Sequence, residues 1–149
     1  MAGKTDVFEL DFLKLIFNGT AIANIADNAS SSPVTDLYVS LHTADPTDAA
    51  ASGQATNETS YTGYARVAVA RTTGGWTCST TGGVTTVVPV ANISFGQCTA
   101  GSASISHVGI GTASSGAGKL LFSGSLSPAI AVSSGVIPQI TTASTITED

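Results

Sequence analysis

Apolar positions near the N-terminus follow the period of a helix. In the stretch TDVFELDFLKLIFNGT the apolar side chains recur at three- and four-residue intervals, which places them on one stripe of a helix. The stripe consists of Phe8, Phe12, Leu15 and Ile16. Acidic residues crowd the first turn, where the helix dipole favours negative charge, and Asn18-Gly19 is typical of a helix end. We therefore predict an amphipathic helical segment within residues 1–28.

After Pro33 the pattern changes to short β-type runs separated by Gly, Ser and Pro. DLYVSLHT alternates apolar and polar positions, which predicts a half-buried strand. Further strands are predicted in YTGYARVAVAR, VTTVVPVANISF, SASISHVGIGT, KLLFSGSLS, AIAVSSGVIPQI and STITED, whereas RTTGGWTCSTTGG is interpreted as turn chemistry around Trp76. About seven or eight short strands predict an antiparallel β-sandwich or jelly-roll-like domain over residues 34–149. Because the helix precedes the strands, parallel α/β folds are disfavoured, and residues 1–149 are expected to form a single, mainly β domain.

One polar stretch, ADPTDAAASGQATNETS, interrupts the predicted strands. Its side chains are expected to be too small and too polar to pack. The stretch is longer than an ordinary connection between strands, which indicates either a functional loop or a mobile solvent loop.

The composition argues against several classes of protein. Only 10% of residues are charged and 42% are hydrophobic, against about a quarter charged in an average domain. A thinly charged surface suggests that much of it lies against other protein. The net charge is −5 with five Lys and Arg residues, too few and too scattered for direct nucleic-acid binding. No signal peptide is predicted, since Asp6, Glu9 and Asp11 interrupt the apolar core that it would need. No membrane span is predicted, since no run approaches the ~18 apolar residues that a span needs.

The stretch ASSGAGKLLFSG resembles a phosphate-binding loop only in part. Ala113, Gly118 and Lys119 stand at the positions that such a loop fixes, but the next residue is Leu120 rather than a Ser or Thr that could ligate magnesium. No helical pattern follows, although the loop needs a helix N-terminus to bind phosphate. We therefore predict a hairpin turn between two strands, with no nucleotide site.

Other catalytic and metal-binding arrangements are not predicted either. His42 and His107, the two histidines, both fall inside predicted strands, where a satisfied or half-exposed side chain is expected rather than a metal ligand. Cys78 and Cys98 could form a disulfide, but free thiols are expected in a reducing cytoplasm, and no further cysteine is present to complete a zinc site. Paired carboxylates for acid–base work are scarce. The sequence therefore predicts a protein that is not an enzyme and that holds no cofactor or metal.

Several stretches resemble a family of small virion proteins from tailed phages and prophages. They are LYVSLHTADP, NETSYTGYARVAVAR, ISHVGIGTASSGAGKLLFSGSLSPAIAVSSGVIPQI and the terminal STITED, together with the amphipathic start. The resemblance implies a structural protein of the virion, made in the host bacterial cytoplasm. It favours a capsid decoration (cement) protein on the capsid surface that bridges major capsid subunits as a homo-dimer or homo-trimer. The alternative is a tail or tail-fibre component in contact with tail proteins; a fibre tip is usually richer in aromatic residues than the 6% found here.

The residues expected to contact such partners lie in the N-terminal helix, in the polar loop, in the predicted strand YTGYARVAVAR and at the C-terminus. The candidates are Phe8, Phe12 and Phe17 of the helix, Asp45 and Tyr61 at the two ends of the polar loop, Arg66 and Arg71, and the terminal acids Glu148 and Asp149. The phenylalanines are core residues if the helix packs on its own domain, and contact residues if it docks on a neighbour. The arginines are the candidate electrostatic partners for acidic neighbours, each pair contributing about 1 kcal/mol or less on an exposed face.

Overall fold

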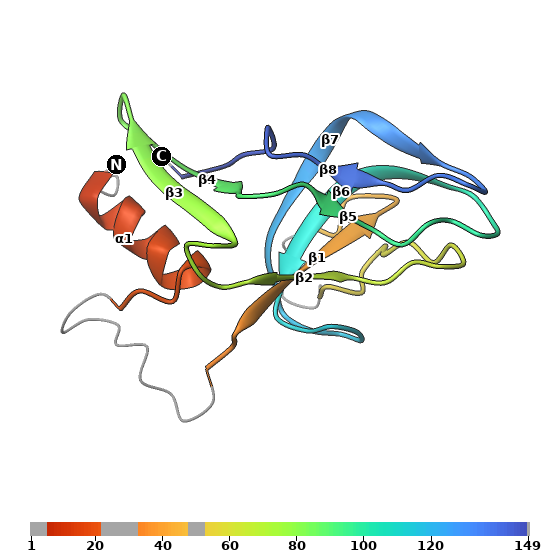
Figure 1. Ribbon diagram of the computed structural model, residues 1–149, viewed down its shortest axis with the longest axis horizontal. Helices are drawn as coiled ribbons and strands as arrows, with labels where there is room; N and C mark the ends of the chain where they lie inside the picture. Colours follow the sequence, from red (N-terminus) through yellow and green to blue (C-terminus); the bar gives the residue numbers. More distant parts are fainter. Residues whose placement is uncertain (1–5, 22–32, 48–52, 149) are drawn as a thin grey trace. The chain divides into compact units, whose positions relative to one another are not determined.

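The computed structural model describes residues 6–21, 33–47 and 53–148 of the chain (Figure 1). Its elements are α1 (Asp6–Phe17), β1 (Asp36–His42), β2 (Val67–Ala70), β3 (Trp76–Thr81), β4 (Val84–Pro89), β5 (Ile93–Ser94), β6 (Ala103–Gly111), β7 (Leu120–Val132), β8 (Gln139–Ile140) and β9 (Ile146–Glu148). Within these ranges, no helix has the length and hydrophobicity that crossing a bilayer requires.

The chain divides into two compact units that interleave along the sequence. Unit 1 comprises Met1–Thr35, Ala70–Asn92 and Ile140–Asp149, and unit 2 comprises Asp36–Val69 and Ile93–Gln139. The strands of unit 1 form the sheet β3-β4-β9. The main sheet of unit 2 has the order β2-β1-β6-β7, and β5 and β8 form a short two-stranded sheet.

In unit 1 the helix packs against its own chain. Leu13 and Phe17 are fully buried, and the Phe17 ring meets Trp76 edge to face with the ring centroids 5.0 Å apart. Figure 1 shows α1 alongside β3. The buried Glu9 of α1 accepts a hydrogen bond from the Thr85 hydroxyl of β4 at 3.2 Å, which satisfies part of a group that would be costly to bury alone. The buried face of the helix therefore carries Glu9, Leu13 and Phe17. It is not the predicted stripe, of which Phe12, Leu15 and Ile16 are only half-buried. Asn18-Gly19 ends the helix as predicted, with Gly19 at φ 65°.

Strand β3 lies where the sequence indicated only a turn. Trp76 is buried and Cys78 half-buried, whereas Thr77 and Ser79 are exposed, so the strand alternates with period two. It pairs antiparallel with β4, and the connecting Gly82-Gly83 has φ of 61° and 82°, the left-handed conformation of a tight hairpin turn. The prediction was wrong because polar Thr residues were taken as loop-forming, although their β-branched side chains favour strands.

The four-stranded sheet of unit 2 carries most of that unit's core. Strand β1 pairs antiparallel with β6 from Tyr38 opposite Gly111 to His42 opposite His107. The buried apolar side chains of these two strands are Leu37, Val39, Leu41, Ile105 and Ile110. Strand β1 was expected to be half-buried, but Ser40 and His42 on its other face are also buried, so both faces of its C-terminal half are covered.

The stretch that resembled a phosphate loop is the turn between β6 and β7, as predicted. Gly111 pairs with Leu120 across the antiparallel ladder, and the Thr112 amide donates to the Lys119 carbonyl at 3.1 Å. The lysine is exposed and is followed by the 13-residue strand β7. A hairpin of this kind presents no helix N-terminus to a phosphate group.

The predicted class, mainly β with antiparallel sheets and an N-terminal helix, is confirmed. The division of one domain into a helical segment over 1–28 and a β-sandwich over 34–149 stays a prediction. Residues 22–32, which include the end of the first part and most of the connection to the second, lie outside the described residues.

Candidate functional site

The end of the polar loop in unit 2 is held against the turn between β6 and β7. Gln54 is fully buried: its Nε2 donates to the Tyr38 carbonyl at 2.7 Å, and its Oε1 accepts from the Ala113 amide at 3.3 Å. Its backbone amide donates to the Gly118 carbonyl at 2.8 Å. A Cβ at Gly111 would lie 2.3 Å from Gln54 Oε1, so glycine leaves the room that this side chain fills. The expectation that the loop is too polar to pack is wrong for this part, because the backbone satisfies the buried amide.

Next to Gln54 in the fold, three side chains form what we call the Glu58 cluster: Glu58, Tyr64 and Arg66. Arg66 holds the carboxylate with two parallel bonds, Nε to Oε1 and Nη2 to Oε2, each 2.7 Å long. The Tyr64 hydroxyl donates to Oε1 at 2.6 Å. Arg66 also donates to the carbonyls of Ala113 at 2.8 Å and Gly116 at 2.7 Å. One buried guanidinium therefore ties the loop to the β6–β7 turn.

The electrostatics of the Glu58 cluster favour its charged form. Burial alone would raise the pKa of Glu58, but the hydrogen bonds from Arg66 and Tyr64 and the charge of Arg66 outweigh it and lower the pKa. The same bond to Glu58 raises the pKa of Arg66 against the effect of burial. Burial, and then the hydrogen bond to Glu58, raise the pKa of Tyr64, which keeps its hydroxyl protonated as a donor. The arrangement is a neutralised structural pair.

A second buried polar group lies at the end of β1. His42 Nδ1 donates to the Thr56 carbonyl at 2.8 Å, so Nε2 is the acceptor for the Ser40 hydroxyl at 2.9 Å. A serine beside a histidine resembles the pair of a nucleophile and its base. Both side chains, however, are 0% exposed, and the third partner is a carbonyl rather than a carboxylate. The pair holds the loop to β1, as expected of a satisfied strand histidine.

We expect the stability of the protein to fall between about pH 6.5 and 5 because of His42. Burial lowers the pKa of His42 below 6.5, and its bond to Thr56 offsets this only in part. The unfolded chain therefore binds a proton in this window before the folded one does, so stability decreases as the pH falls. The pKa of Glu58 is also lowered, so its contribution to stability is lost only as the pH falls below the usual glutamate pKa of 4.5.

The measurement is the thermal midpoint across this pH range for the native protein and for His42→Asn. The asparagine amide can still donate to Thr56 but does not titrate. The midpoint of the variant should change much less between pH 6.5 and 5. Equal slopes for both proteins would contradict the assignment to His42.

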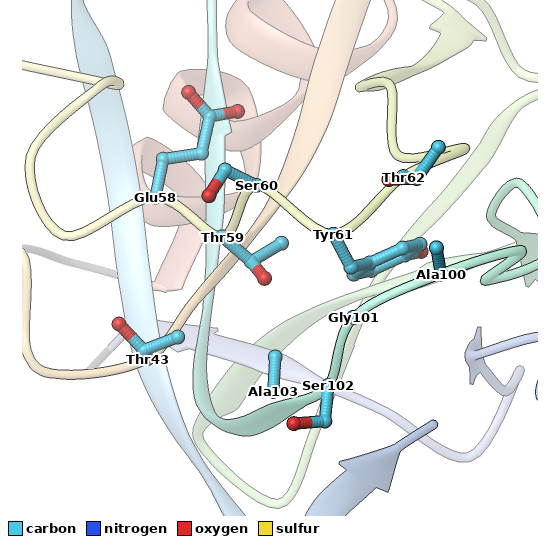
Figure 2. A pocket seen from close by; sticks show the side chains of 10 residues that line it. All are labelled: Thr43, Glu58, Thr59, Ser60, Tyr61, Thr62, Ala100, Gly101, Ser102 and Ala103. Atoms are coloured by element: carbon cyan, nitrogen blue, oxygen red, sulfur yellow. The ribbon is translucent and has the colours of Figure 1, made fainter. Parts of the chain in front are cut away.

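Two open depressions in unit 2 flank the segment that carries the cluster. The first, which we call the hydroxyl depression, has a volume of about 370 Å³ and is lined by Thr43, Glu58, Thr59, Ser60, Tyr61, Thr62, Ala100, Gly101, Ser102 and Ala103 (Figure 2). The second, of about 430 Å³, shares Glu58, Thr59, Ser60 and Tyr61 and is completed by Tyr64, Ala65, Arg66, Ser114, Ser115 and Gly116. Among the described residues, no three His, Cys, Asp or Glu side chains gather in a way that could hold a metal ion.

Arg71, whose predicted contact with a partner stays a prediction, caps α1 within unit 1. Its Nε donates to the Ile16 carbonyl at 2.6 Å, and Nη2 donates to the Leu15 carbonyl. Nη1 donates to Val34 at 3.3 Å. The last carbonyls of a helix have no partner inside the helix, and a cation there also interacts favourably with the helix dipole. Arg71 thus terminates a helix that lies more than fifty residues away in sequence.

Arg71→Ala should fray the last turn of α1 and cost about 1–2 kcal/mol of stability, as expected for charged hydrogen bonds at a helix C-terminus. Amide hydrogen exchange in residues 15–20 should accelerate, because the carbonyls of that turn lose their donors. Arg71→Lys is the matched control: it keeps the charge but not the fork, and should have a smaller effect. Unchanged exchange in Arg71→Ala would contradict the capping role.

The other residues predicted as partner contacts are spread over both units. Phe17 is buried and Phe12 half-buried in α1 of unit 1. In unit 2, Asp45 is exposed and its carboxylate accepts the Thr47 amide at 2.8 Å, while Tyr61 is buried. Arg66, expected on an exposed face, is buried in the Glu58 cluster. The side chains of Phe8 and Glu148, and all of Asp149, lie outside the described residues.

Sequence reasoning missed Glu58, Tyr64 and Gln54 as members of a site. A signal for the first was available. Glu58 is the only carboxylate residue between Asp48 and Glu148, and Arg66 is the first basic residue after it. Two opposite charges eight positions apart in so neutral a stretch have few other partners, which favours an internal pair. Gln54 offered no comparable signal, because its partners come from Tyr38 and the β6–β7 turn.

Comparison with known proteins identifies a family. The family model described as Podophage GP4 fiber I protein gp80 matches residues 5–147. No curated protein matches the chain. Because the match spans nearly the whole chain, the protein belongs to the podophage GP4 fiber I protein gp80 family and is a structural protein of a phage virion, in agreement with the resemblance seen in the sequence.

Proposed function

We propose, on the premise of that family membership, that the protein is a non-enzymatic component of a phage fibre. The observation that carries the proposal is the family match over residues 5–147, whose description names a fibre protein. The sequence resemblance favoured capsid decoration with the major capsid protein as partner. A location on the capsid is therefore kept as the alternative, since the family description names a fibre protein and does not mention the capsid.

The charged groups, and the serine and histidine that resemble a catalytic pair, are bonded to other groups inside the fold, which supports a structural role. Glu58 and Arg66 neutralise each other, and the Ser40–His42 pair is closed off from solvent. Each of these groups links a loop to a strand or turn. Their hydrogen bonds stabilise the fold rather than leaving a poised nucleophile or base at a surface.

The distribution of charge supports contacts with further copies of the chain or with other virion proteins. Between Thr72 and Thr147 the only residue with a fixed charge is Lys119, although the whole chain carries −5. Interface cores are depleted in charged residues because burying an unpaired charge is costly. Apart from Lys119, the residues from Thr72 to Thr147 can therefore be covered by protein without desolvating a charged side chain. We take a homo-dimer or homo-trimer as the assembly form, with no nucleic acid or membrane partner.

The experiment is to locate the protein in intact virions. Gold-labelled antibodies raised against the full chain should mark fibres in negative-stain micrographs, and the protein should co-purify with detached tails and fibres. Heads separated from tails provide the matched control and should remain unlabelled. Label on the shell, with ordered density at symmetry-related capsid positions in cryo-electron microscopy, would overturn the fibre proposal and establish decoration.

A further inference from the structure

One side chain in the hydroxyl depression has a polar group without a partner. Thr59 is 5% exposed, and its Oγ1 has no hydrogen-bond partner in the part of the chain that the structure describes. Figure 2 shows this hydroxyl pointing toward the space beside Ala103 and Gly101. Buried hydroxyls are nearly always hydrogen-bonded in folded proteins, since an unpaired one is destabilising. A buried, unpaired hydroxyl that lines an open depression is therefore available to a bound group.

The rest of the lining is rich in hydroxyls. Thr43, Ser60, Thr62 and Ser102 are all exposed and border the depression. Thr43 Oγ1 donates to the Asn57 carbonyl at 3.3 Å, which leaves its lone pairs free to accept. A hydroxyl can donate and accept at once. The wall therefore suits a ligand that also carries several donors and acceptors, and an apolar ligand would leave these groups unpaired.

The charges around the depression argue against an ionic ligand. Glu58 is the only charged side chain in the lining, and Arg66 already neutralises it through two hydrogen bonds. A cationic ligand would meet a paired carboxylate, and an anionic ligand would find no unpaired cation among the lining residues. The ligand that fits is neutral.

The backbone that carries these side chains is held in place from two sides. The Thr62 amide donates to the Ala100 carbonyl at 3.0 Å, and the Thr99 amide donates to the Thr62 carbonyl at 2.9 Å. At the other end, the Thr59 amide donates to Leu41 in β1 at 2.9 Å. The lining segments are therefore fixed before a ligand binds, which reduces the entropy lost on binding.

We propose that the hydroxyl depression binds one neutral, polyhydroxylated ring, such as a hexopyranose, with Thr59 Oγ1 hydrogen-bonded to a ligand hydroxyl. The volume of about 370 Å³ lies at the lower end of the range for small-molecule sites, about 300–1,000 Å³, and suits a single ring. The ring is either a free sugar or the terminal unit of a glycan. The proposal does not depend on whether the chain is placed in a fibre.

The test is an NMR titration of the full chain with glucose, galactose, mannose and N-acetylglucosamine at millimolar concentrations. At least one sugar should shift the amides of residues 58–62 and 100–103, and should do so saturably. Sodium phosphate should leave these amides unchanged. A methyl glycoside of the binding sugar that still binds identifies a terminal glycan unit, and one that no longer binds identifies a free sugar.

Thr59→Val removes the hydroxyl and keeps the shape of the side chain. We expect it to weaken binding of the responding sugar by at least tenfold while the thermal midpoint stays equal or rises, because no internal hydrogen bond is lost. Thr59→Ser should retain binding. Thr77→Val makes the same chemical change on an exposed position of β3 and should leave binding intact.

Three results would overturn the proposal. The first is that no sugar shifts these amides. The second is that Thr59→Val binds as well as the native protein. The third is that Thr59→Val lowers the thermal midpoint while Thr77→Val does not, which would mean that the hydroxyl is satisfied within the fold.

Discussion

Arg66→Ala should destabilise unit 2 by about 3 kcal/mol, the loss expected when one partner of a buried ion pair is removed. The variant leaves the Glu58 carboxylate, whose side chain is only 15% exposed, without its bidentate partner. It also removes the donor to the Ala113 and Gly116 carbonyls. The loss is best measured by urea denaturation followed by near-ultraviolet circular dichroism of tyrosine, since Tyr38, Tyr61 and Tyr64 all belong to unit 2.

Two controls separate the ion pair from a general loss of positive charge. Lys119→Ala removes an exposed cation from the same β6–β7 turn and should change stability by less than about 0.5 kcal/mol. The double variant Glu58→Gln with Arg66→Met should lose less stability than the sum of the losses in Glu58→Gln alone and Arg66→Met alone, because the two groups are coupled. Equal effects of Arg66→Ala and Lys119→Ala would show that the pair contributes nothing.

Phe17→Ala should destabilise unit 1 by about 3–5 kcal/mol, the usual cost of truncating a fully buried phenylalanine. The ring is 0% exposed and packs edge to face on Trp76, so the change leaves a cavity and removes an aromatic contact. Trp76 is the only tryptophan of the chain. The fluorescence emission of Trp76 should shift to longer wavelength, and the unfolding transition that it reports should move to a lower urea concentration.

The matched control for this change lies on the same helix. Phe12 is only half-buried, so Phe12→Ala should cost about 1 kcal/mol and leave the Trp76 emission nearly unchanged. If the two variants lose equal stability, or if Phe12→Ala produces the larger spectral shift, the helix packs through a different face from the one described.

The elements that were predictable from the sequence are those with local causes. The spacing of the apolar residues in α1 and the Asn18-Gly19 stop specify the helix and its end. The glycines before Lys119 specify the β6–β7 turn, because two strands flank them in sequence. Strand β3 was missed although its alternation was present, since Thr and Ser are read as loop residues when polarity alone is considered.

The candidate site was predictable only in its position along the chain. The unusual length of the polar stretch pointed to the region that ends at Tyr61, where both depressions lie. Its chemistry was not predictable, because each contact joins residues far apart in sequence. Arg66 meets carbonyls about fifty residues away, and Gln54 occupies space left by Gly111. Local patterns carry no information about such pairs.

The interleaving of the two units has a consequence for how the chain completes its fold on the ribosome. Unit 2 ends at Gln139, whereas unit 1 still needs β9, which pairs with β4 through Thr85 and Glu148. During synthesis from the N-terminus, every residue of unit 2 emerges before unit 1 is complete. The edge of β4 that pairs with β9 therefore stays unpaired until residues 146–148 emerge. A nascent chain released early would contain all of unit 2 and an unfinished unit 1, an aggregation-prone product.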